Sequence, residues 1–314
     1  MSADRFLITG GAGFIGSNLV AELLAHGHEV AVFDNFSTGR RRNLAPFARD
    51  IEIIEADLRD AAAVRQAIKG RTFVLHQAAL PSVARSVQDP VASNEVNVNG
   101  TLNVLLAARD AGVRRVVAAS SSSVYGDTPT LPKVESMPVL PMSPYAVSKL
   151  AAEKYCSAFF TVYGLETVAL RYFNVFGPRQ DPSSQYSAVI PRFITALKRK
   201  ERPVIYGDGL QSRDFTFVTN VVEANLLACH APNAAGEFFN VACGARFTLL
   251  DLLQTLSELM GAAAESQHEP ARMGDVRHSL ADITKIQRAM GFEPRWSFRA
   301  GLEQTVAHFE KESL

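Results

Sequence analysis

The sequence is poor in the residues that build disulfide frameworks and metal clusters. Its 314 residues include three cysteines, an odd number without paired spacing, which argues against a disulfide framework or a four-thiolate zinc site. The seven histidines do not stand with carboxylates at ligand spacing, so no metal is expected. Reduced thiols and a cytoplasmic location follow as expectations.

Neither sign of charge is in excess, because Lys and Arg together number 32 and so do Asp and Glu. This balance gives no global basic field that would attract nucleic acid or an anionic membrane. No apolar run approaches the roughly 18 residues of a membrane-spanning helix. The opening residues MSADRFLIT lack the basic start and longer apolar run of a signal peptide. We therefore expect no nucleic-acid partner and no membrane span.

What is present is the composition of an ordinary folded protein. Apolar residues make up 47% of the chain and charged residues 20%, which excludes disorder by composition. The length predicts about two domain-sized units.

Short, β-branched apolar runs alternate with helical stretches through the first half. Strands are expected at Arg5–Thr9, Val30–Asp34, Ile51–Ala56, Phe73–Gln77, Arg115–Ser120 and Thr167–Arg171. Helices are expected at Phe14–His26, Ala61–Lys69, Val91–Ala111 and Ser143–Tyr163. This rhythm predicts an α/β fold, a Rossmann-type doubly wound parallel sheet covered on both faces.

The alternation ends near Tyr172, and a smaller, mixed α/β lobe is expected beyond it. A loop is expected over Asn174–Gln185, followed by helices at Ala188–Lys200, Thr219–His230, Leu249–Met260, Asp282–Met290 and Arg299–Glu312, with strands at Pro203–Tyr206 and Phe238–Val241. We predict a nucleotide-binding domain over residues 1–172, which also receives about 218–245, and a substrate-binding lobe over 173–314.

A glycine loop follows the first expected strand and opens the first helix. Gly10, Gly13 and Gly16 have the spacing G-x-x-G-x-x-G, which suits a tight turn, close backbone approach to a pyrophosphate and close helix–strand packing. Asp34 closes the second strand, where a carboxylate accepts from ribose hydroxyls and repels a 2′-phosphate. The pattern predicts NAD rather than NADP, and the downstream cluster Arg40–Arg42 is interpreted as a solvated charge cluster.

A phenol and an ammonium stand on one expected helix face, because Tyr145 and Lys149 are four residues apart. A nearby cation stabilises a phenolate and lowers the tyrosine pKa, so Tyr145 is expected to exchange protons near neutral pH. Ser121 belongs to a serine run, 120–123, at the carboxyl end of the fifth strand, where such sheets bind their ligands. A hydroxyl there can hydrogen-bond the reacting oxygen.

These motifs resemble the extended short-chain dehydrogenases/reductases of the NAD-dependent epimerase/dehydratase family. The resemblance rests on the glycine loop, Val124-Tyr125-Gly126, the Tyr145/Lys149 pair and Arg171-Tyr172-Phe173-Asn174. More closely, the chain resembles the UDP-N-acetylglucosamine and UDP-glucose 4-epimerases, from about Phe6 to Phe309. The resemblance implies NAD, a UDP-sugar and a homodimer with a four-helix interface made by stretches Val91–Ala111 and Leu150–Tyr163.

The resemblance also implies a role for each matching residue. Tyr145 would be the catalytic base and acid, Lys149 would hold the NAD ribose, and Ser121 would bind the sugar O4. The implied NAD contacts are Gly10, Gly13, Phe14, Ile15, Gly16, Asp34, Asn35, Ser37, Thr38, Gly39, Asp57, Leu58, Gln77, Ala78, Ala79, Tyr145, Lys149 and Tyr172. The implied substrate contacts are Val83, Ser121, Ser122, Ser123, Tyr145, Asn174, Ala188, Val189, Val204, Tyr206, Arg213, Arg272, Asp275 and Ser279.

Other activities compete with epimerisation on this scaffold. Dehydratases and decarboxylases that share it typically place carboxylates just before Val-Tyr-Gly, where this chain has Ser122 and Ser123, so epimerisation is favoured. A net 4-ketoreductase would use an exchangeable cofactor, usually NADPH, which Asp34 disfavours. A non-catalytic nucleotide-binding module would not need Ser121 or Tyr145.

The choice of sugar rests on one position. Ser279 stands where the glucose-restricted epimerases resembling this chain carry a bulky tyrosine, so room for an N-acetyl group at C2 is expected. UDP-glucuronate is the alternative substrate. The glucuronate epimerases often have Thr in place of Asn174 and Arg in place of Asp181.

Overall fold

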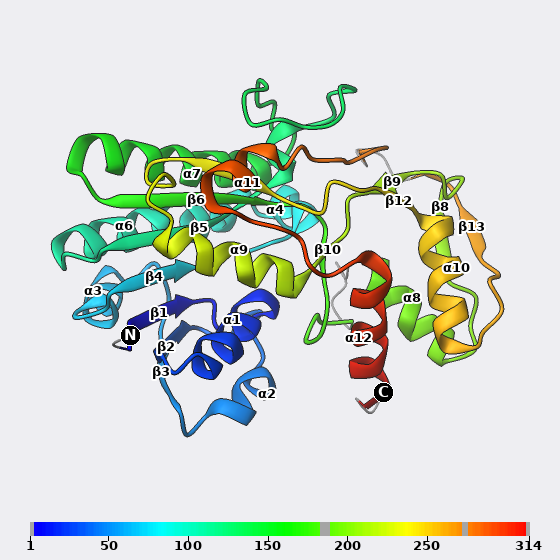
Figure 1. The fold of residues 1–314 in the computed structure, drawn as a ribbon, viewed down its shortest axis with the longest axis horizontal. Helices are drawn as coiled ribbons and strands as arrows, with labels where there is room; N and C mark the ends of the chain where they lie inside the picture. The colour runs from blue at the N-terminus through cyan, green and yellow to red at the C-terminus, as the bar shows by residue number, and fades with distance from the viewer. Residues whose placement is uncertain (1–2, 183–188, 272–275, 312–314) are drawn as a thin grey trace.

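The computed structural model describes residues 3–182, 189–271 and 276–311 (Figure 1). A seven-stranded sheet in which every neighbouring pair is parallel dominates the first part of the chain. Its strands, from one edge to the other, are β11 (Phe238–Val241), β6 (Glu166–Tyr172), β5 (Arg115–Ser121), β4 (Phe73–His76), β1 (Arg5–Thr9), β2 (Glu29–Asp34) and β3 (Ile51–Glu55). The expected Rossmann-type α/β fold is confirmed.

Helices cover both faces of this sheet, which is why its strands are almost continuously apolar. One face packs against α1 (Phe14–Ala25), α9 (Val218–His230) and α11 (Thr284–Met290). The other packs against α3 (Ala61–Ile68), α6 (Gly100–Asp110) and α7 (Pro144–Tyr163). Along β1 the side chains alternate between the two cores, since Phe6 and Ile8 join the first and Leu7 joins the second.

Helix α7 has clear local reasons to begin and end where it does. The Ser143 hydroxyl accepts a hydrogen bond from the Ala146 amide, and Pro144 occupies the first helical position. Gly164 ends the helix in the left-handed conformation, with φ of 70°. These signals fix the register that places Tyr145 and Lys149 near the helix start.

The stretch expected as one helix over Val91–Ala111 is interrupted. It consists of α5 (Pro90–Asn94), a wider π-helical turn at Glu95–Asn99, and α6. Within the turn, the Asn97 side chain accepts from the Leu80 amide at 2.8 Å and donates to the Ser148 hydroxyl at 3.0 Å. The turn therefore directs a buried amide between the β4 loop and α7, a use for which such turns are known.

The second part of the chain holds three two-stranded sheets and three helices around their own core, at the right of Figure 1. The sheets pair β7 (Val175–Phe176) with β10 (Thr216–Phe217), β8 (Val204–Tyr206) with β13 (Gln267–Glu269), and β9 (Ser212–Arg213) with β12 (Phe247–Thr248). The helices are α8 (Val189–Lys198), α10 (Leu249–Met260) and α12 (Phe298–Lys311).

Several short elements depart from the sequence-based expectation. The stretch Asn174–Gln185, expected as a loop, contains β7, and the Arg40–Arg42 cluster opens the short helix α2 (Arg41–Leu44). Helix α4 (Val83–Gln88) was also unexpected. Elements of two to six residues are too short to show a hydrophobic period, so the sequence pattern misses them.

The later part of the chain returns to the central sheet twice. Strand β11 pairs with β6, and α9 packs across α1. Helix α11 then lies on β11 and adds Ile286 and Met290 to the core beside α1 and α9. Residues 284–292 thus pack with the sheet, although the sequence placed them in the second lobe. Over the described residues no helix is long and apolar enough to cross a membrane.

Candidate active site

The glycine loop between β1 and α1 forms a cradle that side chains would obstruct. Gly10 has φ of +70°, and a Cβ there would lie 2.7 Å from the backbone N and Cα of Ala78. A Cβ on Gly16 would lie 2.2 Å from the Gly10 carbonyl oxygen. Gly13 caps α1 without a side-chain hydrogen bond, and the first turn has no acidic residue. The amide groups at this helix start therefore suit an anion such as a pyrophosphate.

Asp34 holds the backbone around this loop in place. Its two carboxylate oxygens accept from the amides of Ala12, at 2.9 Å, and Phe36, at 2.8 Å. Burial raises the pKa of Asp34, and these two hydrogen bonds oppose the rise. A Cβ on Gly39 would lie 2.9 Å from both oxygens, so the glycine lets the chain pass close to the carboxylate.

A cleft of about 900 Å³ runs from the glycine loop to Tyr145 and Lys149. Every residue that the sequence suggested as a cofactor contact lines it: Gly10, Gly13, Phe14, Ile15, Gly16, Asp34, Asn35, Ser37, Thr38, Gly39, Asp57, Leu58, Gln77, Ala78, Ala79, Tyr145, Lys149 and Tyr172. The bare glycine cradle and the acid at the end of β2 fit a dinucleotide such as NAD.

The cleft also has a wall that the sequence did not predict. Arg179 donates to the Asn18 side-chain oxygen at 2.6 Å, and Asn18 donates to the Pro178 carbonyl oxygen at 3.2 Å. Asp181 forms an ion pair with Arg40, and Arg40, Arg179 and Asp181 all line the cleft. Arg40, interpreted from sequence as part of a solvated cluster, instead ties the β2 loop to the second part of the chain.

The catalytic candidates meet where β5 ends beside the start of α7. Burial raises the pKa of Tyr145, and a hydrogen bond with Ser121 opposes the rise. Lys149 donates to the Ala119 carbonyl oxygen at 2.9 Å, and burial lowers its pKa to about 8. The expected lowering of the phenol pKa by Lys149 is not found, because burial dominates and Ser121 supplies the opposing contact.

The serine run is organised around Ser121. Ser123 donates to the Ser121 hydroxyl oxygen from its own hydroxyl, at 2.9 Å, and from its amide, at 3.2 Å. With its oxygen accepting twice, the Ser121 proton is directed elsewhere, which agrees with the hydrogen bond to Tyr145. Ser122 and Ser123 are partly exposed, so both can contact a ligand.

The remaining substrate candidates are spread over several elements. The Asn174 side chain donates to the Ser279 hydroxyl oxygen at 3.4 Å and to the Asp214 carbonyl oxygen at 3.3 Å. Arg213 donates to two backbone carbonyl oxygens, those of Ser212 and Arg277. Among the described substrate candidates, Tyr145 alone lines the cofactor cleft; Val83, Ser121, Ser122, Ser123, Asn174, Val189, Val204, Tyr206, Arg213 and Ser279 lie outside it. Ala188, Arg272 and Asp275 fall outside the described residues.

Within the ranges 3–182, 189–271 and 276–311, no three His, Cys, Asp or Glu side chains are grouped so that they could hold a metal ion. The acids near the site are engaged with protein groups instead. Glu153, for example, binds Arg171 and Ser120. Ser121, Tyr145 and Lys149 bring a hydroxyl, a phenol and an ammonium group to this site.

Comparisons with known proteins identify the family of this chain. The model of the "NAD dependent epimerase/dehydratase family" matches residues 6–242. A UDP-glucose 4-epimerase of Mycolicibacterium smegmatis is 41% identical, over 98% of this chain and 99% of the relative. A solved UDP-N-acetylglucosamine 4-epimerase from Methanobrevibacter ruminantium, in complex with UDP-N-acetylmuramic acid, has a TM-score of 0.94 at 41% identity, over 99% of each chain. A UDP-N-acetyl-alpha-D-glucosaminuronate decarboxylase of Bacillus cytotoxicus is 32% identical, over 98% of each chain.

Proposed function

The chain belongs to the NAD dependent epimerase/dehydratase family, and we propose that it is a UDP-hexose 4-epimerase. Its proposed substrates are UDP-N-acetylglucosamine and UDP-N-acetylgalactosamine, together with UDP-glucose and UDP-galactose. The observation that carries the proposal is that Tyr145 and Lys149, the expected catalytic pair, line a cleft that fits the family's cofactor.

The proposed roles follow from what each group can do. Bound NAD supplies the acceptor and the donor of hydride at the sugar C4. Tyr145 removes the O4 proton as the 4-keto sugar forms, and returns it to O4 after the sugar has turned over. Ser121 hydrogen-bonds the reacting oxygen. Lys149, a buried cation held on the Ala119 carbonyl oxygen, would hold the NAD ribose.

The serines beside Ser121 favour epimerisation over elimination or decarboxylation. Dehydration needs an acid and a base at C5 and C6, and positions 122 and 123 carry hydroxyls that do not ionise near neutral pH. Glu153, a carboxylate close to β5, is buried and bound by Arg171 through two hydrogen bonds. It is therefore an unsuitable proton carrier for the sugar.

The preference for an N-acetyl group rests on a small side chain. Ser279 is hydrogen-bonded to Asn174, the residue expected to reach the substrate. A serine at this position leaves volume that a tyrosine would fill, so a bulky substituent at C2 of the sugar meets no steric hindrance. UDP-glucuronate is the alternative substrate, and the test below separates it.

A homodimer is part of the proposal. The resemblance implies an interface made by Val91–Ala111 and Leu150–Tyr163, and large apolar side chains stand exposed there: Leu106 at 40%, Phe160 at 37% and Val162 at 68%. Multi-angle light scattering should give twice the chain mass. The mass of a single chain would contradict this part of the proposal.

The deciding experiment is proton NMR of the purified protein with three substrates in turn. UDP-N-acetylglucosamine, UDP-glucose and UDP-glucuronate are incubated separately, without added reductant, and the anomeric signals of the 4-epimers are followed to equilibrium. We expect conversion of UDP-N-acetylglucosamine. Conversion of UDP-glucuronate alone would keep the reaction and overturn the substrate. No conversion of any sugar, with NAD supplied, would refute the epimerase proposal.

The matched control is the variant Tyr145→Phe. It should abolish turnover and leave NAD and UDP-sugar binding largely intact, because only the phenol oxygen is removed. Binding is measured by calorimetry and folding by circular dichroism. Retained turnover in this variant would remove Tyr145 from the mechanism.

A further inference from the structure

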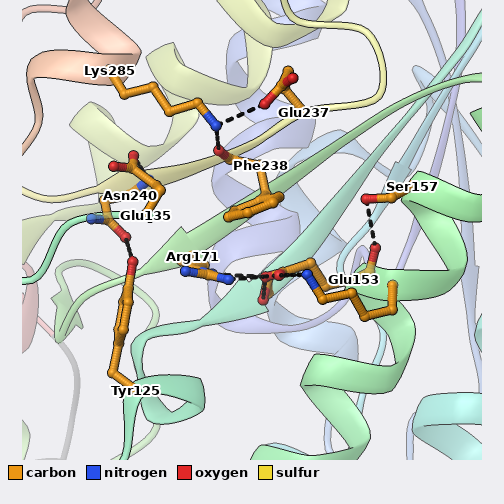
Figure 2. Close-up of polar contacts among 11 residues, drawn as sticks. Tyr125, Glu135, Glu153, Ser157, Arg171, Glu237, Phe238, Asn240 and Lys285 are labelled. Atoms are coloured by element: carbon orange, nitrogen blue, oxygen red, sulfur yellow. Dashed lines mark hydrogen bonds and ion pairs between the residues drawn. The ribbon is translucent and has the colours of Figure 1, made fainter. Parts of the chain in front are cut away.

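Helix α7 carries a third polar residue that reaches the sheet below Tyr145 and Lys149. Glu153 is 1% exposed, and its carboxylate accepts three hydrogen bonds. Ser120 donates from its hydroxyl at 2.9 Å, and Arg171 donates from Nε at 2.8 Å and from Nη2 at 2.7 Å. Figure 2 shows the Arg171 guanidinium and the Glu153 carboxylate joined by these hydrogen bonds.

The two partners of Glu153 are neighbours across the sheet. In the parallel pairing of β5 with β6, Ser120 lies opposite Arg171, and Ser121 lies opposite Tyr172. Glu153 therefore binds both strands, at the residue that precedes Ser121 in β5 and at the residue that precedes Tyr172 in β6. A single carboxylate joins three elements directly beneath the catalytic constellation.

Arg171 is itself held on both sides. Its guanidinium lies 4.3 Å from the centre of the Phe238 ring and 4.8 Å from that of Tyr125. The Tyr125 hydroxyl donates to the Asn240 side chain at 2.7 Å, as Figure 2 shows. Arg171 cannot shift toward either ring without disrupting this packing, so the guanidinium that binds Glu153 is held in a fixed position.

Stability alone is a poor reason to build such a pair. Burying two charges costs desolvation, and apolar residues of similar volume often stabilise a core as well or better. In the described structure Arg171 Nη1 is also buried without a hydrogen-bond partner. The pair does supply directional geometry, which apolar packing does not.

We propose that Glu153 is a positioning residue that sets Ser121 and Tyr145 at their working separation by fixing Ser120 and Arg171 to α7. The proposal rests on the proposed function, since it takes Ser121 and Tyr145 as the reacting pair. Helix α7 then meets three consecutive residues of β5: Lys149 donates to the Ala119 carbonyl oxygen, Glu153 accepts from Ser120, and Tyr145 lies beside Ser121. Loss of the middle contact frees the strand end to move relative to the helix.

The first test removes the middle contact at the strand. Ser120→Ala deletes the hydroxyl that donates to Glu153 and leaves the two hydrogen bonds from Arg171 in place. We expect kcat to fall by about 10- to 100-fold, the range set by a displacement near 1 Å. The KM for the sugar should stay within about twofold, because none of the proposed sugar contacts is changed. Since Ser120 also lines the cofactor cleft, kcat is compared at saturating NAD.

The matched control is Ser157→Ala, one turn further along α7. Ser157 donates to the Glu153 backbone carbonyl oxygen at 3.4 Å and not to its carboxylate (Figure 2). This variant should leave kcat and KM unchanged. A fall in kcat equal to that of Ser120→Ala would show that any loss of a hydroxyl in this region has the same effect, and the proposal would be wrong.

A double-mutant cycle tests whether Ser120 acts through Glu153. Adding Ser120→Ala to Glu153→Gln should lower kcat no further than Glu153→Gln alone, because the shared contact is already altered. Independent, multiplying losses would overturn the link between the two residues.

The titration of Tyr145 gives a readout that needs no substrate. Phenolate absorbance is followed against pH, and subtraction of the Tyr145→Phe curve isolates this residue from the other six tyrosines. Because the hydrogen bond with Ser121 lowers the pKa of Tyr145, Ser120→Ala should raise it and Ser157→Ala should not. An unchanged titration in Ser120→Ala would refute the positioning role. It does so even if the wild-type protein epimerises none of the three UDP-sugars, an outcome that would refute the proposed function separately.

Discussion

Replacing Lys149 by methionine should make the protein more stable while it removes activity. Lys149 is 6% exposed, and its ammonium donates to the Ala119 carbonyl oxygen at 2.9 Å. Burial lowers its pKa from 10.5 to about 8. The charged form is therefore held in the fold at a cost, which an apolar side chain of similar length avoids.

The magnitude follows from the pKa. At about 1.36 kcal/mol per pH unit, the fall from 10.5 to about 8 corresponds to about 3 kcal/mol of destabilisation at pH 7. Losing the hydrogen bond to Ala119 costs about 1 kcal/mol. A net gain of about 2 kcal/mol is expected for Lys149→Met at pH 7.

The pH dependence gives the sign of the effect independently. Below pH 8 Lys149 is protonated in both the folded and the unfolded chain, so the free-energy cost of burying the cation is fully present. Between pH 8 and 10.5 the unfolded chain binds more protons than the folded one, so this contribution to stability rises with pH. Above 10.5 the penalty is gone, and wild type and variant should differ only by the lost hydrogen bond.

Urea unfolding of both proteins at pH 7 and pH 10.5 measures these differences. The free energy of unfolding of Lys149→Met should exceed that of the wild type at pH 7, and the excess should shrink at pH 10.5. A variant that is less stable at pH 7, or an excess that does not change with pH, would show that burial does not penalise this cation. NMR of the epimerisation should meanwhile show loss of turnover.

Three further changes test other parts of the site. Gly10→Ala should weaken NAD binding by at least tenfold, about 1.4 kcal/mol, since its Cβ would lie 2.7 Å from the Ala78 backbone at a φ of +70°; calorimetry gives the affinity. Burial raises the pKa of Asp214 to about 6 from 3.8. The folded chain therefore binds the Asp214 proton more tightly than the unfolded chain does. The wild type should lose about 3 kcal/mol of stability from this group as the pH rises from about 4 to about 6. Unfolding of Asp214→Asn over the same range should lack that part of the loss. Ser279→Tyr should suppress turnover of the N-acetyl substrate more than that of UDP-glucose in the NMR assay, and equal losses would rule out a size gate.

The features that the sequence predicts correctly are those determined by residues close together in the sequence. Strand Arg5–Thr9 and helix Leu249–Met260 have the expected bounds, because each is a continuous apolar pattern with its own end signals. The glycine loop was recognisable for the same reason, since its conformation is set within a few residues. All expected cofactor residues consequently line one cleft.

The features that it misses depend on contacts far along the chain. Arg40 and Asp181 are 141 residues apart in sequence, and an exposed charge cluster looks the same whether or not a distant acid meets it. The π-helical turn at Glu95–Asn99 is hidden because the apolar spacing continues through it. Two-residue strands such as β7 exist only through their partner strand, here β10.

Buried carboxylates make backbone and side-chain contacts that the sequence does not predict. Asp34 accepts from two amides near the glycine loop, and Asp214 accepts from the amides of Cys243, Gly244 and Ala281. Glu153 accepts from β5 and β6. Burial raises the pKa of Asp34 and of Asp214. All three carboxylates nevertheless fix segments that are distant in sequence, around the cofactor loop, beside Asn174 and next to Ser121. For Asp34 and Asp214, a carboxylate whose burial is unfavourable thus holds backbone beside the proposed site, so the stability and turnover of their variants should change independently.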